Sequence, residues 1–589
     1  MKKWVLIIIT LLSVYLLLPV HQAHIVSAQP PPPPPPVIPP PPPPPPSSSF
    51  GIVNTRHNLS ISGPGTIKSS TEERICVFCH TPHTARVDTP YLWNRQETFG
   101  HTPYDSTTLY SSIGQPTGAS KMCLSCHDGT VALGALLYPP EIPFIGGIRF
   151  MPDNGSNLDV DLSDDHPVSF LYNSTLATNN GELAQPSTLP PQIALDNNSL
   201  MQCTSCHDPH YDQYGSFLVM SNVYSALCTA CHQNNGWGVS SHSTSDAIWN
   251  GLGVDPWPQS SYITVSENGC MNCHVSHNAG GHARLLNYQF EENNCIACHN
   301  GNVAATDIEA EISKQYGHSV QSFSGIHDPA EDFTSGSVPE HVECSDCHNP
   351  HWSNENPSSG APLVSGATEG VSGINSIGQN VAIASNQYEI CFQCHADNNV
   401  INVASIDRQI QQLNTRLEFE PSNPSYHPVE SQGTNANVPS LLPPYTTSSI
   451  IYCTDCHSSN AGGPKGPHGS NYKYLLSENY VALDFTIESP LSYELCYKCH
   501  DRNSILADQS GFSHNNHVVN KSTPCAACHD AHGINFVQGN SLNNSHLINF
   551  DITIAQPDSQ GRLRFEDTGT FSGQCYLNCH NVAHEPLAY

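Results

Sequence analysis

The feature that most constrains this chain is a short pattern of cysteine and histidine that recurs from one end to the other. All 24 cysteines of the 589-residue sequence fall into pairs, and a histidine directly follows the second cysteine of every pair. Two residues separate the cysteines in the first eleven pairs, and three separate them in the twelfth. Numbered 1–12 along the chain, the motifs are Cys76, Cys79, His80; Cys123, Cys126, His127; Cys203, Cys206, His207; Cys228, Cys231, His232; Cys270, Cys273, His274; Cys295, Cys298, His299; Cys344, Cys347, His348; Cys391, Cys394, His395; Cys453, Cys456, His457; Cys496, Cys499, His500; Cys525, Cys528, His529; and Cys575, Cys579, His580.

This spacing is typical of covalent haem attachment. Two thiols bond the vinyl groups of one haem through thioethers, and the histidine beside them binds the iron as its proximal ligand. A zinc site needs further cysteines or histidines but no histidine directly after each second cysteine. The motifs therefore predict 12 covalently bound c-type haems with the motif histidines as proximal ligands. The wider spacing between Cys575 and Cys579 leaves the ligation of the twelfth haem open.

The second iron ligand is indicated by histidines outside the motifs. The mature chain has few methionines, and most lie beside or inside a motif, so bis-histidine ligation is predicted. The sequence repeats a unit six times: a leading histidine, an odd-numbered motif, a trailing histidine three residues on, and an even-numbered motif. The fifth unit departs from this pattern, because its trailing histidine, His468, lies eleven residues after the motif. The predicted distal ligands are the leading histidines His57, His166, His242, His318, His427 and His517, and the trailing histidines His83, His210, His277, His351, His468 and His532.

Seven histidines are left over by this assignment. Among them, His282, His341 and His514 are alternatives to the predicted distal ligands of their units. A trailing histidine reaches only about 10 Å from its own motif, so it cannot bind the opposite face of that motif's haem. We expect it to bind a neighbouring haem and thereby to force haems into close pairs. The seven are His101, His282, His327, His341, His514, His546 and His584.

The density of the motifs also limits the fold. Motifs 3 and 4 begin only 25 residues apart, as do motifs 5 and 6, which leaves no room for ordinary layered domains. The predicted fold class is a multihaem cytochrome c, in which a mostly irregular chain with short α-helices and little sheet wraps a chain of haems. One longer helix is predicted from residue 406 to the residue before Pro421, where Ile406, Ile410, Leu413 and Leu417 share a face. The predicted segments are a signal peptide (1–28), a proline-rich linker (29–50), and six haem-pair regions at 51–150, 151–240, 241–310, 311–405, 406–505 and 506–589.

The N-terminal sequence predicts export. Lys2 and Lys3 precede an apolar run over residues 4–20, and the Val-Ser-Ala sequence that ends at Ala28 fits a signal-peptidase site. The following linker contains two long proline runs, which adopt extended polyproline II. We expect an extracellular or cell-surface location, with the periplasm as the alternative, and no membrane span after cleavage.

Charge narrows the class of partners. Only 12% of residues are charged and the formal net charge is −31, which excludes nucleic-acid binding through a basic surface. A negative field around bis-histidine haems predicts low reduction potentials and attraction to cationic partners or metal ions.

Several runs carry a family resemblance. The segments "ERICVFCHTPH", "SKMCLSCHDGTVALG", "DLSDDHPVSF" and "CTSCHDPH" resemble those of exported multihaem cytochromes with doubled Cys-x-x-Cys-His motifs, over residues 51–589. The resemblance implies periplasmic haem ligation and electron transport in the periplasm or at the cell surface. Some relatives polymerise into extracellular haem filaments in which a histidine of one subunit completes a haem of the next.

Three functional hypotheses follow from this sequence. The first is a non-enzymatic electron conduit that passes electrons to other redox proteins or extracellular acceptors, with no catalytic residues. The second is a multihaem reductase for nitrite, hydroxylamine or a sulfur oxyanion, which requires one haem with an open coordination position. The third, compatible with the first, is self-association into filaments. The distal histidines named above suffice for every haem, which favours the conduit.

Overall fold

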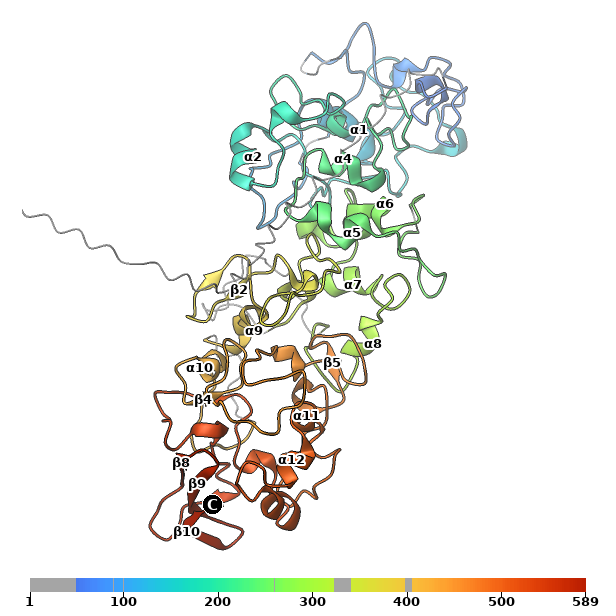
Figure 1. The fold of residues 1–589 in the computed structure, drawn as a ribbon. Helices are drawn as coiled ribbons and strands as arrows, with labels where there is room; N and C mark the ends of the chain where they lie inside the picture. The colour runs from blue at the N-terminus through green and yellow to red at the C-terminus, as the bar shows by residue number, and fades with distance from the viewer. Residues whose placement is uncertain are drawn as a thin grey trace, which may run out of the picture. The chain divides into compact units, whose positions relative to one another are not determined.

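The computed structural model describes residues 49–87, 89, 91–98, 100–258, 260–321, 341–397 and 405–589. The predicted signal peptide, nearly all of the predicted linker, and His327 lie outside the described residues. Ser49–Tyr589 forms one compact unit. Within it, Figure 1 shows short helices and strands distributed along a mostly irregular chain, which is the predicted fold class. No helix among the described residues combines the length and apolar character that a membrane span requires.

The α-helices are short, and many coincide with motifs. The even-numbered motifs 2, 4, 6, 8 and 10 lie on α-helices or at their C-terminal ends, whereas most odd-numbered motifs form a single 3₁₀ turn, as at Cys76–Phe78 and Cys525–Ala527. A turn is enough because it closes the loop between the cysteines through local backbone bonds. The α-helices are α1 (Gly118–His127), α2 (Ser174–Asn180), α3 (Cys203–Cys206), α4 (Ala226–Thr229), α5 (Ser241–Thr244), α6 (Val265–Asn268), α7 (Glu291–Ile296), α8 (Ile308–Ile312), α9 (Gln387–His395), α10 (Thr415–Phe419), α11 (Glu494–Tyr497) and α12 (Arg502–Leu506).

The strands form four small antiparallel sheets in the described part of the chain. Three sheets are two-residue pairs, β1 with β5, β2 with β3, and β4 with β6. The fourth lies near the C-terminus, where β9 pairs with β7, β8 and β10. The strands are β1 (Tyr316–Gly317), β2 (Gly373–Ile374), β3 (Asn380–Val381), β4 (Ser425–Tyr426), β5 (Gly469–Ser470), β6 (Gly533–Ile534), β7 (Ala555–Gln556), β8 (Arg564–Gly569), β9 (Ser572–Cys579) and β10 (Val582–Ala588).

Apolar side chains gather in several small clusters beside the motifs. In one, Phe78 and Leu133 are each 1% exposed, and Cys79 and Cys126 pack against the cluster. In another, Phe392 of α9 is fully buried and Cys453 packs against its neighbours. These clusters surround the cysteines, so the apolar part of the fold is built around the attachment sites.

The helix predicted from residue 406 to the residue before Pro421 is wrong for most of its length. Only α10, Thr415–Phe419, is helical, and the side chain of Asn414 caps it by accepting a hydrogen bond from the backbone of Arg416. The preceding residues bond to a distant segment instead: the backbone of Gln409 donates to Phe550, and that of Ile410 donates to the side chain of Asn549. These tertiary hydrogen bonds outweigh the helical periodicity of the apolar residues.

Candidate haem-binding sites

Most motif histidines point one particular ring nitrogen away from the backbone. The hydrogen bonds of the described residues engage Nδ1 in eight of them, in most cases with a backbone carbonyl, as in His80 with Tyr91 (2.6 Å) and His127 with Ser156 (2.7 Å). A metal-binding histidine commonly donates its second ring N–H in this way, which fixes the ring and directs the other nitrogen at the metal. The loops therefore orient Nε2 of these histidines so that it can bind iron.

A second histidine lies opposite most motif histidines. The separations between ring centroids fall between 6.0 and 6.4 Å for every facing pair. The pairs are His80–His210, His127–His57, His207–His277, His232–His166, His274–His351, His299–His242, His348–His468, His395–His318, His457–His532 and His529–His514.

These separations match what one iron between two imidazoles requires. A bond from a transition metal to an imidazole nitrogen is about 2 Å long, and the nitrogen lies about 1.1 Å from the ring centre, so the two centroids lie about 6.2 Å apart. A small, partly open pocket lies beside Cys203 and His277, with Tyr104, Leu124 and Leu162 in its lining. The residues present therefore fit bis-histidine c-type haems, with the motif cysteines as attachment points.

The pairing follows one rule along the chain. A leading histidine faces the even-numbered motif of its own unit, as His57 faces His127. A trailing histidine faces the odd-numbered motif of the preceding unit, as His210 of unit 2 faces His80 of unit 1. For unit 5 the leading histidine His427 and motif histidine His500 interact electrostatically. Trailing histidines thus link consecutive units.

A hydrogen bond ties together the two histidines that face the two motifs of one unit, one histidine from that unit and one from the next. The Nδ1–H of His57 donates to Pro209, which directly precedes His210. The same bond runs from His242 to Pro350, from His318 to Pro467 and from His427 to Ala531, each acceptor directly preceding a trailing histidine. Strand pairs lie beside two of these bonds, β1 with β5 and β4 with β6. We call this recurring arrangement the interlock.

The cysteines of consecutive motifs adjoin in chain order. Between units, the first cysteines are in side-chain contact, as Cys123 is with Cys203 and Cys496 with Cys525. Within units, the second cysteine of the odd motif lies close to cysteines of the even motif, as Cys79 does to Cys126. Cysteines of consecutive motifs therefore lie near one another at every junction from motif 1 to motif 12, and between units they are in side-chain contact, so the attachment sites form one continuous row.

Burial favours the uncharged form of several facing imidazoles. Desolvation lowers the pKa of His232 and of His299 to about 4, with a smaller contribution from the charge of the facing histidine. It also lowers the pKa of His529 to about 3, with a smaller contribution from His514. A neutral imidazole offers the lone pair that a metal ion needs.

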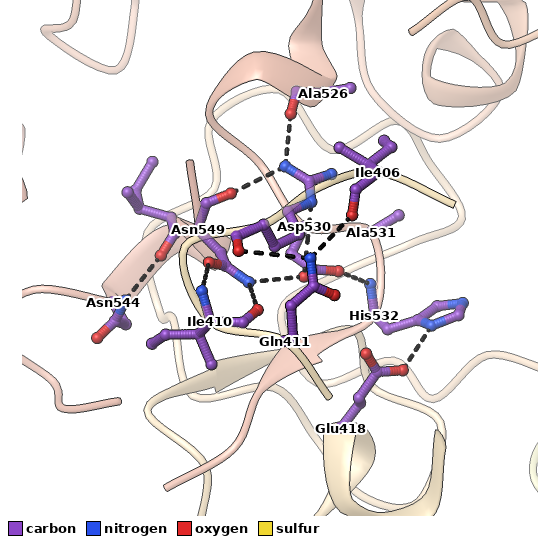
Figure 2. A network of polar contacts seen from close by, with 12 residues as sticks. Ile406, Ile410, Gln411, Glu418, Ala526, Asp530, Ala531, His532, Asn544 and Asn549 are labelled. Carbon is purple, nitrogen blue, oxygen red and sulfur yellow. Dashed lines mark hydrogen bonds and ion pairs between the residues drawn. The ribbon is translucent and has the colours of Figure 1, made fainter. Parts of the chain in front are cut away.

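Two carboxylates modify individual sites. Nδ1–H of His277 donates to Asp165 at 2.9 Å. Nδ1–H of His532 donates to Glu418 at 2.8 Å, as Figure 2 shows. Burial lowers the pKa of His532, but the nearby carboxylates of Glu418 and Asp530 outweigh this effect and raise the pKa overall. Burial raises the pKa of Glu418. A carboxylate partner makes a ligating imidazole a stronger donor. Sequence reasoning assigned no such role to Glu418, because it lies far from every motif in sequence.

Two buried arginines hold motif loops in place. Arg95 is fully buried and donates to the carbonyls of Ser125 and Leu133, the first of which lies inside motif 2. Arg408 donates to the carbonyls of Ala526, inside motif 11, and Asn549, in the network that Figure 2 shows. Each guanidinium satisfies buried carbonyls and brings a positive charge to a site.

The remaining predicted site residues lie apart from this pattern. Among the described residues, no imidazole faces His83, which is exposed. His580 contacts Asp484 and Phe485 rather than another histidine. Of the leftover histidines, His101 pairs with Asp128 and His546 with Asp567, whereas His514 faces His529 and His584 faces His517. Sequence reasoning named His514 as an alternative in its unit but gave His584 no role.

These features define a multihaem c-type cytochrome built from doubled Cys-x-x-Cys-His motifs and carrying multiple covalent haems. Two comparisons with protein families agree. Residues 262–425 match the family described as outer membrane cytochrome MtrC/MtrF-like, domains II/IV. Residues 198–236 and 443–504 match the doubled CXXCH motif family. Among curated proteins, none matches the chain significantly.

Proposed function

We propose that the chain is an exported electron-transfer protein that holds twelve bis-histidine c-type haems in one row and serves electron acceptors outside the cell. A c-type haem supplies a one-electron iron couple. The observation that carries the proposal is that cysteines of consecutive motifs lie near one another at every junction. A single-site enzyme has no need of such an uninterrupted arrangement.

The residues of the chain do three things in this proposal. The cysteines fix the order of the sites, the paired histidines would hold each haem iron between them, and the interlock holds neighbouring units in register. An iron held by two histidines would have no open position for a substrate, which disfavours the reductase hypothesis. The match to an outer membrane cytochrome family supports a cell-surface location.

The trailing histidine His83 bears on self-association. By the pairing rule, His83 of unit 1 would face the odd-numbered motif of a unit that precedes unit 1. A second copy would accept it only at an odd-numbered motif whose second ligand is missing, and in unit 6 His514 already faces that motif's His529. We therefore propose a carrier whose haem ligands all come from one chain. A filament is the alternative assembly, and electron microscopy of secreted material separates the two.

Interrupting the row tests the conduit. Replacing Cys344 and Cys347 with alanine removes site 7 from the middle, and replacing Cys76 and Cys79 removes only the terminal site 1. Each variant should carry one haem fewer than the wild type, so measuring the haem content of both shows that they differ only in which site is missing. Conduction across immobilised single molecules should fall at least tenfold for the central variant and little for the terminal one. Equal effects of the two variants would contradict the proposal.

A further inference from the structure

The twelfth motif differs from the other eleven in backbone conformation. In the motifs outside helices α1 and α9, the amide of the motif histidine donates to the carbonyl of the first cysteine, as His529 does to Cys525. In the twelfth, Cys575 and Cys579 lie on strand β9, which pairs with β10 through a two-residue turn. The turn residues His580 and Asn581 both have positive φ, 50° and 61°, the conformation of a type I′ hairpin. The extra residue is accommodated in a hairpin rather than a helical turn.

The hairpin directs His580 away from the position that the other motif histidines occupy. The Nε2–H of His580 donates to the carboxylate of Asp484, with both oxygens 2.9 Å away. Its ring also stacks on Phe485, with centroids 4.8 Å apart. A nitrogen that carries a proton toward a carboxylate has no lone pair for iron. In the eight motif histidines described above, Nδ1 is engaged and Nε2 is left for the metal.

Another histidine of the hairpin, His584, is placed to act as an iron ligand at motif 12. His584 lies opposite Leu577 on β9, and side chains at directly opposed positions share one face of a sheet. Because side chains alternate along a strand, that face also carries Cys575 and Cys579. His584 is 7% exposed, whereas the other residues of β10 are exposed. Its ring centroid lies 6.3 Å from that of His517, within the range of the ten pairs above.

The interlock recurs in unit 6 with local residues. The Nδ1–H of the leading histidine His517 donates to Ser513 at 2.8 Å, and Ser513 directly precedes His514. His514 faces His529 of motif 11 at 6.4 Å. In units 1, 3, 4 and 5 the corresponding acceptor precedes a trailing histidine that comes from the next unit. The π-helical segment Asn515–Asn520 bends the chain here, so that His514 and His517 serve different sites.

We infer that the haem at motif 12 is held by His517 and His584, and not by the motif histidine His580, and that His514 completes motif 11. The C-terminal unit thus supplies its own second ligand for its odd-numbered motif, whereas in the other units this ligand comes from the next unit. His580 anchors the loop around Asp484 and Phe485 instead. This inference rests on the proposed haem loading, which the haem content of the unaltered protein tests separately.

Single substitutions in the full-length holoprotein test it. The variants are His584→Ala, His580→Ala and, as a matched control on an exposed histidine, His83→Ala. Haem per chain is measured by pyridine haemochrome and intact mass, and spin state by low-temperature electron paramagnetic resonance of the ferric protein. His584→Ala should turn about one-twelfth of the haem high-spin, allow one equivalent of carbon monoxide to bind after reduction, and recover its low-spin signal with added imidazole. His580→Ala and His83→Ala should stay low-spin throughout.

Two further variants keep the inference falsifiable if His584→Ala does not accumulate. His517→Ala should give the same single high-spin site, and His584→Met should keep a six-coordinate iron while raising the potential of one haem. High-spin iron in His580→Ala, or none in both His584→Ala and His517→Ala, would overturn the inference. A holoprotein with far fewer than twelve haems would overturn the proposed function instead.

Discussion

The Nδ1–H of His57 donates to the carbonyl of Pro209 at 2.9 Å, across 152 residues of sequence. Pro209 directly precedes His210, which faces His80, while His57 itself faces His127. One hydrogen bond therefore couples the second ligands of two neighbouring sites, and those ligands come from two different repeat units.

The pairing rule predicts which histidine completes site 1. His210→Ala should leave His80 without a partner, so that one haem per chain becomes high-spin and binds carbon monoxide after reduction. His83→Ala should leave every haem low-spin, although His83 lies only three residues from His80. Electron paramagnetic resonance of both variants checks this, and the opposite pattern would show that the trailing histidine serves its own unit.

Carboxylates bound to ligand histidines should lower the potentials of individual haems. Asp165→Asn removes a negative charge that lies 2.9 Å from Nδ1 of His277. We expect the potential of one haem to rise by roughly 50–100 mV, from a Coulomb term of about 1–2 kcal/mol at an effective dielectric constant near 20. Glu418→Gln should have a similar effect through His532. Spectropotentiometric titration measures the shift, and Asp153→Asn, which replaces an exposed acid, should change little.

The buried guanidinium of Arg408 should stabilise the C-terminal unit. Arg408→Met leaves the carbonyls of Ala526 and Asn549 without this donor and Asp530 without its cation at 3.9 Å. We expect a loss of about 3 kcal/mol of unfolding free energy and a lower potential for a nearby haem. Urea denaturation of the holoprotein measures the stability. Arg74→Met, at an arginine whose side chain is 60% exposed, is the control and should lose much less stability than Arg408→Met.

Stability should fall as pH rises through the titration of Glu430. Burial raises the pKa of Glu430 to about 8, which Arg416 partly opposes and Glu420 reinforces. The folded state then holds a proton that the unfolded state releases, so the stabilisation is complete below about pH 4.5 and is lost as pH approaches and passes 8. We expect the wild type to lose roughly 2 kcal/mol across this window, less than a fully buried group would.

Glu430→Gln removes the titrating group. Its unfolding free energy should change less with pH between about 5 and 9 than that of the wild type. Urea titrations at several pH values compare the two proteins. An unchanged slope in the variant would assign the pH dependence to other groups.

The attachment residues follow from the sequence because covalent haem chemistry depends on spacing alone. The pairing of ligands does not, because it depends on which loops return to which motif. His210 sits three residues from motif 3 yet faces motif 1, and no local pattern shows this. Asp165 stands in a run of acidic residues, a pattern that is typical of a solvated loop. Only the fold brings its carboxylate to His277.

Two predictions that rest on local sequence patterns differ from what the structure indicates. The apolar periodicity of residues 406–417 predicted one helix, but the backbone there bonds to residues 549–552, which the periodicity does not reflect. The adjacency of Cys579 and His580 predicted a proximal ligand, and the geometry of the β9–β10 hairpin gives reason to propose His584 in its place. The clue in the sequence was the third residue between Cys575 and Cys579, which sets this motif apart from the other eleven.

The central claim is a continuous row of twelve six-coordinate haems in one chain. Haem content and spin state of the purified wild-type protein test it together, by pyridine haemochrome, intact mass and electron paramagnetic resonance on one preparation. The account predicts twelve covalent haems per chain and a wholly low-spin ferric spectrum. Far fewer haems, or a high-spin fraction of one site or more at full loading, would contradict it.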